Sequence, residues 1–420
     1  MIHAWYPALL RHRAGIARCQ GRWRAWRTWL GVAAILVLAG CAGLPVIDRG
    51  PITSTAIPLA EQTTLGRIAN AYRPEPDHSG FRLLPLGTYS LDTRFQLARR
   101  AEVSLDVQYY HFEMDETGRW LLRALRDAAE RGVRVRLLID DFYTGGGQDE
   151  YFLAFAAHKN VEVRLYNPFC CWRERGQIGR FIGSTGEWGR VNHRMHNKLF
   201  IADGAMAVIG GRNVANEYFL RSTGENFIDV DAFTVGFVVP PLQDLFDRYW
   251  NSDPVYPIHT VTRSLKSDPE LRAWFEERTG AKHTPPPEPL PSNDVLGYGP
   301  IAEELDLGRL GLHWGYAYVF ADHPDKPFDG EAGGELLETS VTYNAFEALR
   351  KTTKELVLSS PYLVPGKIGM DLFKELRDKG VKITLMTNSL GSTDEPIVHA
   401  GYSQYREPML ELGIDLYEIS

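Results

Sequence analysis

The sequence lacks several features that would each define a class of protein. Beyond residue 40, no stretch reaches the roughly 20 apolar residues that a membrane-spanning helix needs, so the folded part is not expected to be an integral membrane protein. Cysteine is rare, with 4 in the whole chain. The adjacent pair Cys170 and Cys171 does not have the spacing of a metal knuckle, and in an exported protein it can be either a disulfide or two partly buried thiols.

Basic charge is scarce outside the N-terminus. The chain has 46 Lys and Arg against 53 Asp and Glu. Residues 1–40 hold six of the arginines and no acidic side chain, so the rest of the chain has a formal balance of 40 minus 53, or −13. Domains that bind nucleic acid usually have a basic surplus, so nucleic acid is not expected as a partner.

The N-terminus has the layout of an export signal. Arginines lead into an apolar run at 29–38, which is short for a membrane span and is followed by small residues. The run Leu38-Ala39-Gly40-Cys41 resembles the bacterial lipobox, which implies cleavage before Cys41 and a lipid on its thiol. The alternatives are a cleaved secretory signal with an incidental cysteine, or an uncleaved short anchor. We expect a lipid-anchored, periplasm-facing protein of a bacterial cell envelope, with Ala42 leaving the outer membrane favoured over the inner.

An internal repeat is the most informative feature. In each copy, apolar residues with period two predict strands, and stretches with a helical apolar face separate them. The strands are predicted at 101–110, 133–139 and 161–166 in the first copy, and at 354–362, 381–386 and 414–417 in the second. Strands that alternate with helices predict an α/β fold with crossover connections, and two related lobes predict a pseudo-twofold axis with a cleft beside it.

The first helix of each copy can be placed more closely. In the first copy, Thr117 is a candidate N-cap, and Gly132 is expected to end the helix in a left-handed conformation. In the second copy, Gly380 has the same position as Gly132. The predicted apolar faces are Leu121, Ala124, Leu125 and Ala128 in the first copy, and Leu372, Phe373 and Leu376 in the second.

These features predict five segments. They are a signal peptide at 1–40, a tether at 41–78, a first lobe at 79–252, an inter-lobe segment at 253–338 and a second lobe at 339–420. The inter-lobe segment is expected to contain one helix near 269–278 and a stiff, proline-rich connector at 285–291.

A candidate active site follows the third strand of the first copy. His196, Lys198 and Asp203 form the pattern H-x-K-x-x-x-x-D, and the run Gly210-Gly211-Arg212-Asn213 comes shortly after. Because residues two apart in a strand point to one face, the His196 and Lys198 side chains can converge on one ligand. An ammonium group suits a phosphate, an imidazole can act as a nucleophile or proton carrier, and amides around Gly211 and Asn213 can hold phosphate oxygens. A His–Lys pair in a strand can also be an ordinary surface feature.

On these residues the chain resembles the phospholipase D superfamily, whose signature is H-x-K-x-x-x-x-D followed by a Gly-[Ser/Gly]-x-Asn segment. The runs at 107–110, 194–198, 210–213 and 398–402 are most similar to bacterial cardiolipin synthases of the C type. The resemblance implies a phospholipase D-like layered α/β sandwich. It also implies a phosphodiester exchange that needs no metal and no other cofactor.

The resemblance further implies a role for each site residue. His196 would attack phosphorus to form a phosphohistidine, while Lys198 and Asn213 would hold the phosphoryl oxygens. Asp203 would brace the motif. An acid some 30 residues on would orient the histidine; Asp229 matches this position and Asp231 is the runner-up, although either could be a charge at a strand edge.

A second motif of this kind is not found in the chain. The family pattern requires one motif from each lobe, but the second copy ends three residues after Tyr417, and no other H-x-K has a matching Asp. We therefore expect a truncated second lobe and little or no turnover, because an essential acid–base partner would be lost. The chain could be a fragment, an inactive remnant, or one half of a site that a second chain completes.

Three functions remain in view. The leading prediction is a phosphatidyltransferase of the cardiolipin synthase type that acts on anionic glycerophospholipids. The second is a nuclease or other phosphodiesterase of the same fold, because the chemistry does not depend on the alcohol attached to phosphorus. The third is a catalytically dead protein that binds within the cell envelope.

Overall fold

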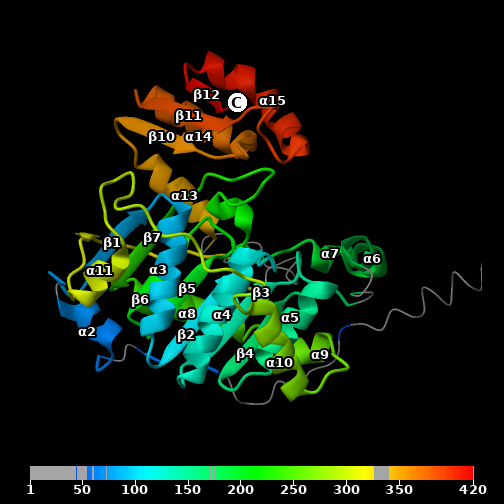
Figure 1. Ribbon diagram of the computed structural model, residues 1–420. Helices are drawn as coiled ribbons and strands as arrows, with labels where there is room; N and C mark the ends of the chain where they lie inside the picture. Colours follow the sequence, from blue (N-terminus) through cyan, green and yellow to red (C-terminus); the bar gives the residue numbers. More distant parts are fainter. Residues whose placement is uncertain are drawn as a thin grey trace, which may run out of the picture. The chain divides into compact units, whose positions relative to one another are not determined.

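The computed structural model describes residues 44, 54–58, 61–71, 73–170, 173, 176–325 and 340–419. They divide into two compact units (Figure 1). Unit 1 comprises the described residues up to 319 together with 324 and 325, and unit 2 comprises 320–323 together with 340–419. The predicted signal peptide at 1–40, the predicted lipidation site Cys41 and the thiol of Cys171 lie outside the described residues.

Unit 1 is built on one mixed sheet, which has nine strands within the described residues. In chain order they are β1 (Ser79–Leu84), β2 (Ser104–Tyr109), β3 (Arg134–Asp140), β4 (Val161–Tyr166), β5 (Leu199–Ala202), β6 (Met206–Gly210), β7 (Asp231–Gly236), β8 (Val255–Pro257) and β9 (His313–Gly315). Their order across the sheet is β8-β4-β3-β2-β5-β6-β7-β1-β9. Strands β2, β3 and β4 are parallel, whereas every other pair is antiparallel.

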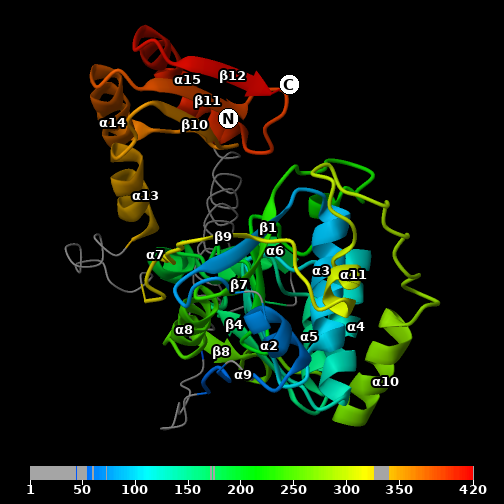
Figure 2. The same ribbon diagram turned by 90° about the vertical axis from the view of Figure 1, so that its left-hand side faces the viewer.

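Helices cover both faces of this sheet (Figures 1 and 2). They are α2 (Thr64–Ala71), α3 (Gly87–Arg100), α4 (Glu116–Glu130), α5 (Gly147–Ala156), α6 (Gly176–Gly183), α7 (Trp188–Val191), α8 (Val239–Trp250), α9 (Ile258–Val261), α10 (Asp268–Thr279) and α11 (Ile301–Asp306), with short 3-10 turns η2 (Thr185–Glu187) and η3 (Asn216–Phe219). Helices α3, α4, α5 and α10 lie on one face, and α8 lies on the other (Figure 2). The layered α/β fold that the sequence predicts is therefore confirmed.

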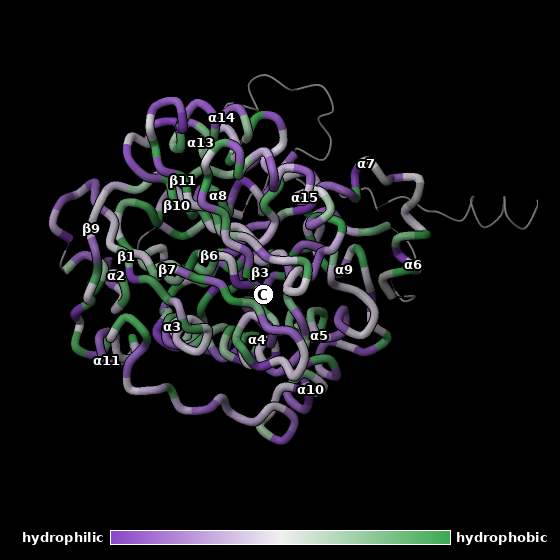
Figure 3. The backbone as a smooth tube through the Cα atoms, turned by 90° about the horizontal axis from the view of Figure 1, so that it is seen from above, coloured by the Kyte–Doolittle hydropathy of each residue, from purple (hydrophilic) through white to green (hydrophobic). Residues whose placement is uncertain are grey.

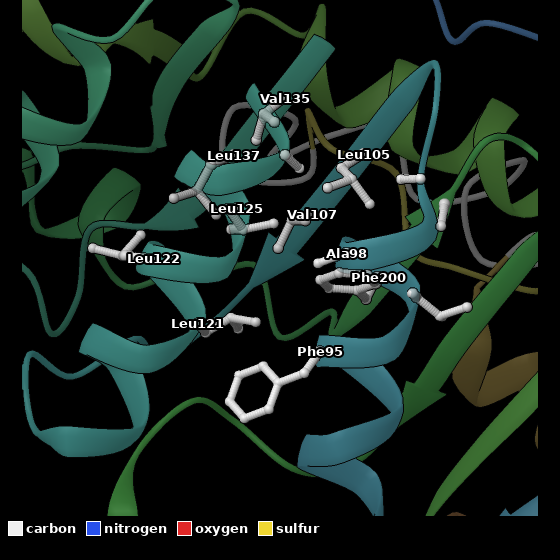
Figure 4. Close-up of a cluster of buried hydrophobic side chains, with 14 of the residues drawn as sticks. Phe95, Ala98, Leu105, Val107, Leu121, Leu122, Leu125, Val135, Leu137 and Phe200 are labelled. Atoms are coloured by element: carbon white, nitrogen blue, oxygen red, sulfur yellow. The ribbon is translucent and has the colours of Figure 1, made fainter. Parts of the chain in front are cut away.

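The main core lies between the sheet and the layer of α3, α4, α5 and α10 (Figure 4). Its side chains include Phe95, Ala98, Leu105, Val107, Leu121, Leu122, Leu125, Val135, Leu137 and Phe200. All of them are buried, and burial of a side chain of the Val, Leu or Phe size contributes roughly 1.5–3 kcal/mol. The predicted face of the first helix is confirmed, since Leu121, Leu125 and Ala128 are fully buried and Ala124 packs against the core.

The N-cap of α4 is not the predicted residue. Asp115 caps the helix, and its carboxylate accepts a hydrogen bond of 3.0 Å from the Gly118 N–H. The Thr117 hydroxyl instead donates to the side chain of Asn216, 2.8 Å away. The predicted end of the helix is confirmed, because Gly132 has a left-handed φ of 101°.

Charged side chains pack between the second face of the sheet and α8. The carboxylate of Asp106 and the guanidinium of Arg136 are 2.7 Å apart and both are buried, and Arg136 also pairs with Asp247 of α8 at 2.8 Å. Residues Ser54 and Thr55 of the predicted tether lie against this network, because Arg136 donates to the Ser54 carbonyl and Arg134 to the Thr55 carbonyl, over 2.9 and 2.8 Å.

The stretch expected to link the lobes lies largely on unit 1. Strands β8 and β9 form the two edges of the sheet, and α10 covers the helical layer at the position where the sequence predicts a helix. The proline-rich run packs along α3 and α4: the Pro285 carbonyl accepts from Trp120 Nε1 at 2.6 Å, and the Pro291 carbonyl accepts from the Tyr89 hydroxyl at 2.6 Å.

Unit 2 repeats the first half of unit 1. It contains β10 (Glu355–Ser359), β11 (Lys382–Asn388) and β12 (Asp415–Ile419), with α13 (Val341–Arg350), α14 (Gly366–Asp378) and α15 (Pro396–Glu411). The three strands are parallel in the order β10-β11-β12, which matches β2-β3-β4, and Gly380 ends α14 with a φ of 80°. The predicted repeat of elements is confirmed, whereas the pseudo-twofold axis and the truncation of the second lobe stay predictions. Within the described residues of both units, no helix has the length and apolarity of a membrane span.

Candidate active site

The candidate site residues gather where central strands of the unit 1 sheet end or begin; we call this end of the strands, which is distinct from the outer strands β8 and β9, the site edge. Gln108 near the end of β2 is opposite Leu199, the first residue of β5. Leu199 is opposite Ile209 near the end of β6, and the last residue of β6, Gly210, is opposite Asp231, the first of β7. The carboxyl ends of β2 and β6 and the start of β5 and β7 therefore meet, which brings 196–198, 211–213 and 229–231 to the same edge.

His196 and Lys198 lie side by side in the extended segment just before β5, rather than inside a strand as expected. Lys198 Nζ is 3.1 Å from His196 Nδ1 and donates to the His196 carbonyl over 2.8 Å. The ring of Tyr110 lies against both, at 4.6 Å from the imidazole centre and 5.3 Å from Nζ. His196 remains exposed to solvent whereas Lys198 is buried, so the pair can meet a ligand from the imidazole side.

The pair has strongly shifted acidities. The surrounding protein atoms, and then the Lys198 charge, lower the pKa of His196 to about 4. Burial lowers the pKa of Lys198 to about 8, although Asp229, Asp140 and Asp231 oppose this shift. At neutral pH the imidazole is therefore uncharged, as a nucleophile must be, and the ammonium group is charged, as a phosphate ligand must be.

Asp203 braces the start of β2. It has a left-handed φ of 53°, and its buried carboxylate accepts hydrogen bonds from the backbone N–H groups of Glu102, Val103 and Ser104 over 2.8–3.1 Å. Because β2 pairs with β5, these bonds hold the strand that begins right after Lys198. The geometry agrees with the bracing role that the resemblance implies.

Gly211 and Asn213 form the wall beside the pair. A Cβ atom at Gly211 would lie 2.3 Å from both carboxylate oxygens of Asp229, so only glycine fits. Asn213 is buried; its Oδ1 accepts from the His111 N–H at 3.1 Å, and its side chain also bonds to the Tyr218 hydroxyl. The Asn213 amide is thus held in one orientation before any ligand binds.

The two candidate orienting acids differ in environment. Asp231 is fully buried and bound by Ser90, by Arg94 at 3.1 Å and by Arg212 at 3.6 Å, so it stabilises the fold. The Asp229 carboxylate accepts from the Val230 N–H at 2.7 Å; burial raises its pKa, while Lys198 is among the groups that lower it.

The expected hydrogen bond between Asp229 and His196 is not the contact that the described residues make. Nδ1 of His196 faces the Lys198 ammonium instead. Asp229 belongs to the same cluster through its attraction to Lys198, which is the first charge that opposes the lowered pKa of that lysine.

Several residues around the site were not expected from the motif alone. Asp140, buried at the end of β3, accepts from the Met195 N–H at 2.8 Å and pairs with Arg194 at 2.7 Å, which holds the chain just before His196. An aromatic wall continues from Tyr110 to Phe142 and Tyr143, with ring centres 6.2 and 5.3 Å away. The sequence feature from which these residues could have been predicted is their position at or just after the ends of predicted strands.

A further pair borders this wall. The His111 ring stacks on Tyr143 at 4.2 Å, and its Nε2 lies 3.3 Å from a Glu113 carboxylate oxygen. Glu113 also accepts from Gln148 at 2.7 Å. Burial raises the pKa of Glu113, but these hydrogen bonds and the His111 charge outweigh it, so the pKa is lowered overall.

One group of potential metal ligands occurs in the described part of the chain. Glu130, His158 and Glu276 have ligand atoms within 4.8 Å of one another, in the helical layer away from the site edge. Arg126 is 3.2 Å from Glu130 and also pairs with Glu276. A guanidinium cation therefore already neutralises these carboxylates, which does not suit a divalent ion.

The sheet and the His–Lys–Asn cluster at its edge define a member of the phospholipase D superfamily. Among solved structures, the fold is similar to phosphatidylserine synthase from Haemophilus influenzae Rd KW20, with a TM-score of 0.51 and 11% identity over 79% of this chain and 69% of that one. Residues 95–250 match the family model described as "Cardiolipin synthase, PLD-like domain".

Sequence comparison identifies the family within this superfamily. The chain is 33% identical over 362 residues to cardiolipin synthase C from Escherichia coli (strain K12), covering 84% of this chain and 72% of that protein. It is 22% identical to a cardiolipin synthase from Clostridium perfringens (strain SM101 / Type A), over 76% of this chain and 54% of that one. The chain belongs to the cardiolipin synthase family of the phospholipase D superfamily, and is a phosphatidyltransferase or phosphodiesterase of that class.

Proposed function

We propose that this chain is a phosphatidyltransferase of the cardiolipin synthase type, which exchanges phosphodiester bonds of anionic glycerophospholipids through a phosphohistidine on His196. The observation that carries the proposal is the pairing of His196 Nδ1 and Lys198 Nζ at 3.1 Å, on an edge that also holds the buried amide of Asn213. The bacterial cardiolipin synthases among its relatives support phospholipids as the substrate class.

In the proposed first step, Nε2 of His196 attacks phosphorus, and the bond from phosphorus to the leaving alcohol oxygen breaks. Lys198 and Asn213 donate hydrogen bonds to the non-bridging oxygens, whose negative charge they stabilise in the transition state. In the second step an acceptor hydroxyl attacks phosphorus and His196 leaves. The alcohol that departs gains a proton and the hydroxyl that attacks loses one, so a general acid–base group must serve both steps.

The contact between Lys198 and Nδ1 sets a condition on this mechanism. While the ammonium group donates to Nδ1, the neutral imidazole carries its hydrogen on Nε2 and cannot attack. We propose that a bound phosphate draws Lys198 to its oxygens, and that the Asp229 carboxylate then accepts the hydrogen from Nδ1. The attraction between Asp229 and Lys198 supports this exchange of partners.

The acid–base group is the component that one motif does not supply. The family resemblance implies a second histidine, and H-x-K-x-x-x-x-D occurs once in the 420 residues. We propose that a second acid–base group completes the site, and that without it the 420 residues form the phosphohistidine slowly, with water giving a proton to the departing alcohol. The sheet of unit 2 exposes Val357, Met386, Tyr417 and Ile419, whereas α8 covers the second face of the matching strands in unit 1, so unit 2 offers a surface on which a partner chain can pack.

The test is to incubate the chain with radiolabelled phosphatidylglycerol in detergent micelles and to measure labelled protein, cardiolipin and phosphatidic acid. We expect labelled protein with the native chain and none with His196→Ala. The matched control is His193→Ala, which removes an exposed imidazole three residues away and should leave labelling unchanged. Equal labelling of the native chain and His196→Ala, or no labelling of either, would overturn the proposal.

The two other functions predict different outcomes, which a DNA cleavage assay and a lipid-binding assay of the same variants would measure. Salt-sensitive cleavage of DNA that is lost in His196→Ala would favour a nuclease, which the acidic balance of 40 to 53 argues against. Tight lipid binding without a phosphohistidine would favour a catalytically dead envelope protein.

A further inference from the structure

Helix α6 presents an apolar face to solvent next to the site edge. Ile178 and Ile182 are one turn apart, so they share a face, and they are 77% and 55% exposed. The helix lies at the periphery of unit 1, near α7 (Figures 1 and 3). Two large aliphatic side chains that are exposed together on one helix are unfavourable, because exposing apolar surface to water costs free energy.

The opposite side of α6 is firmly held. The Arg180 side chain is 2% exposed and donates to the carbonyls of Asp141 and Phe142, over 2.9 and 3.2 Å. The Phe181 ring lies 5.6 Å from Phe142 in an edge-to-face arrangement. These contacts fix the orientation of α6, so the exposure of its outer face is a property of the packed helix and not of a loose segment.

The same contacts connect α6 to the nucleophile. Phe142, which Phe181 touches, is 6.2 Å from the ring of Tyr110, and Tyr110 is 4.6 Å from the imidazole of His196. The exposed isoleucines are therefore separated from the reacting imidazole by three aromatic rings. The outer face of α6 therefore belongs to a helix that packs against the aromatic wall of the site.

The connection from β6 to β7, which also leaves from this edge, has exposed aliphatic residues too. Leu220 is 60% exposed and has a left-handed φ of 58°, a backbone conformation that residues other than glycine rarely adopt. Ile228, in the same connection, is 93% exposed. Leu220 adopts this φ as the C-cap of η3, so only the exposure of Leu220 and Ile228, which adds apolar surface to this connection, bears on a contact outside the molecule.

We propose that the outer face of α6 inserts into the surface of a phospholipid bilayer and brings His196 to the level of the lipid phosphates. This inference rests on the proposed function, since a lipid is the substrate whose phosphodiester lies at such a surface. Amphipathic helices bind membranes by burying an apolar face at the boundary of headgroups and acyl chains. An aliphatic pair beside a site whose proposed substrate is a phospholipid suits this boundary, whereas protein interfaces are rich in aromatic and arginine anchors.

Hydrogen–deuterium exchange of the full chain on vesicles of phosphatidylglycerol and phosphatidylcholine tests the proposal directly. We expect slower exchange of the α6 amides when vesicles are added. The connection between α9 and α10 serves as the internal control. It comes after β8, which runs antiparallel to β4 and so ends on the side of the sheet where β4 begins, away from the site, and it carries the fully exposed Leu265. Unchanged exchange in α6, or equal protection of both segments, would overturn the proposal.

Substitutions separate insertion from chemistry. In Ile178→Ser/Ile182→Ser, phosphohistidine formation from phosphatidylglycerol vesicles should fall about tenfold, while formation from a monomeric short-chain phosphatidylglycerol should not change. Leu265→Ser is the matched control and should change neither rate. Ile178→Trp/Ile182→Trp should keep or raise the vesicle rate, because tryptophan favours the interface.

The outcomes distinguish the two proposals. If the native chain forms no phosphohistidine from either substrate, the proposed function fails, and the exchange experiment still decides whether α6 inserts. If the serine variant loses activity on both substrates equally, or on neither, the inference about α6 is wrong while the proposed chemistry stands.

Discussion

At the scale of single residues, the site depends on two groups whose acidities are shifted in the same direction for one reason. Desolvation by the surrounding protein atoms disfavours the charged forms of both the exposed His196 and the buried Lys198, and the Lys198 charge adds to this effect for the histidine. The result is an uncharged nucleophile beside a cation at neutral pH. An unperturbed histidine would be partly protonated at pH 6, whereas His196 stays neutral down to about pH 4.

The first prediction concerns pH. The rate of phosphohistidine formation at low substrate should rise through about pH 4, as His196 loses its proton, and fall above about pH 8, as Lys198 loses its charge. His193→Ala should have the same profile as the native chain. A rate that stays level up to pH 10 would show that the charge of Lys198 is not needed.

The second prediction concerns Gly211. Gly211→Ala should lower the rate of phosphohistidine formation by about 10- to 100-fold, because its Cβ would lie 2.3 Å from the Asp229 carboxylate and must displace it. Gly224→Ala is the matched control: it lies in the same connection, and its nearest neighbour would be the Ser222 Oγ at 3.7 Å. Equal rates for both variants would contradict a role for the position of Asp229.

At the scale of elements, the ends of strands and helices position the site. The β2–α4 connection supplies His111, which holds Asn213, and Asp115, which caps α4 and also accepts from the Asn216 N–H. The β3–α5 connection supplies Phe142 and Tyr143 of the aromatic wall and contacts α6. Connections at the carboxyl ends of β2 and β3 therefore position the site residues. The geometry of the site depends on the cap of α4 as well as on the motif.

The third prediction concerns the cap of α4. Asp115→Ala should reduce the free energy of unfolding of unit 1 by about 1–2 kcal/mol, because two backbone N–H groups lose their acceptor. Urea denaturation followed by tryptophan fluorescence measures this change. Ser340→Ala removes the cap of α13, a helix of unit 2 without buried side chains, and should leave the unit 1 transition unchanged. A smaller effect of Asp115→Ala than of Ser340→Ala would argue that Asp115 is not the important cap.

At the scale of the whole molecule, the predicted tether is partly docked. Residues 54–58 bond to β3 and α8, and the Ala56 N–H donates to Asp247 at 2.6 Å. A lipid on Cys41 would precede Ser54 by 13 residues (54 minus 41), which reach about 45 Å when extended. Such a reach does not by itself decide which face of unit 1 meets the membrane, so a second contact such as α6 would be needed to orient the site.

The fourth prediction concerns this anchor. Expression of the chain in a bacterium that is fed an alkyne fatty acid should label the native chain and not Cys41→Ala, while Cys170→Ala should label normally. The label is detected by fluorophore coupling in a gel. Labelling of Cys41→Ala would show that the lipid is elsewhere, and an unlabelled native chain would favour a secretory signal or an uncleaved anchor.

The sequence alone determined the features that depend on local pattern. Period-two and helical periodicities predict the three parallel strands of each unit and the helices α4 and α14, and the glycines at 132 and 380 predict where these helices end. The pattern H-x-K-x-x-x-x-D brings His196 and Lys198 together because their spacing is short. Only the tertiary structure decided which distant groups meet: Asp203 with 102–104, Asn213 with His111, and Asp229 with Lys198. The physical reason is that these contacts join segments that sheet pairing and crossover connections bring to one edge, and no local pattern encodes that register.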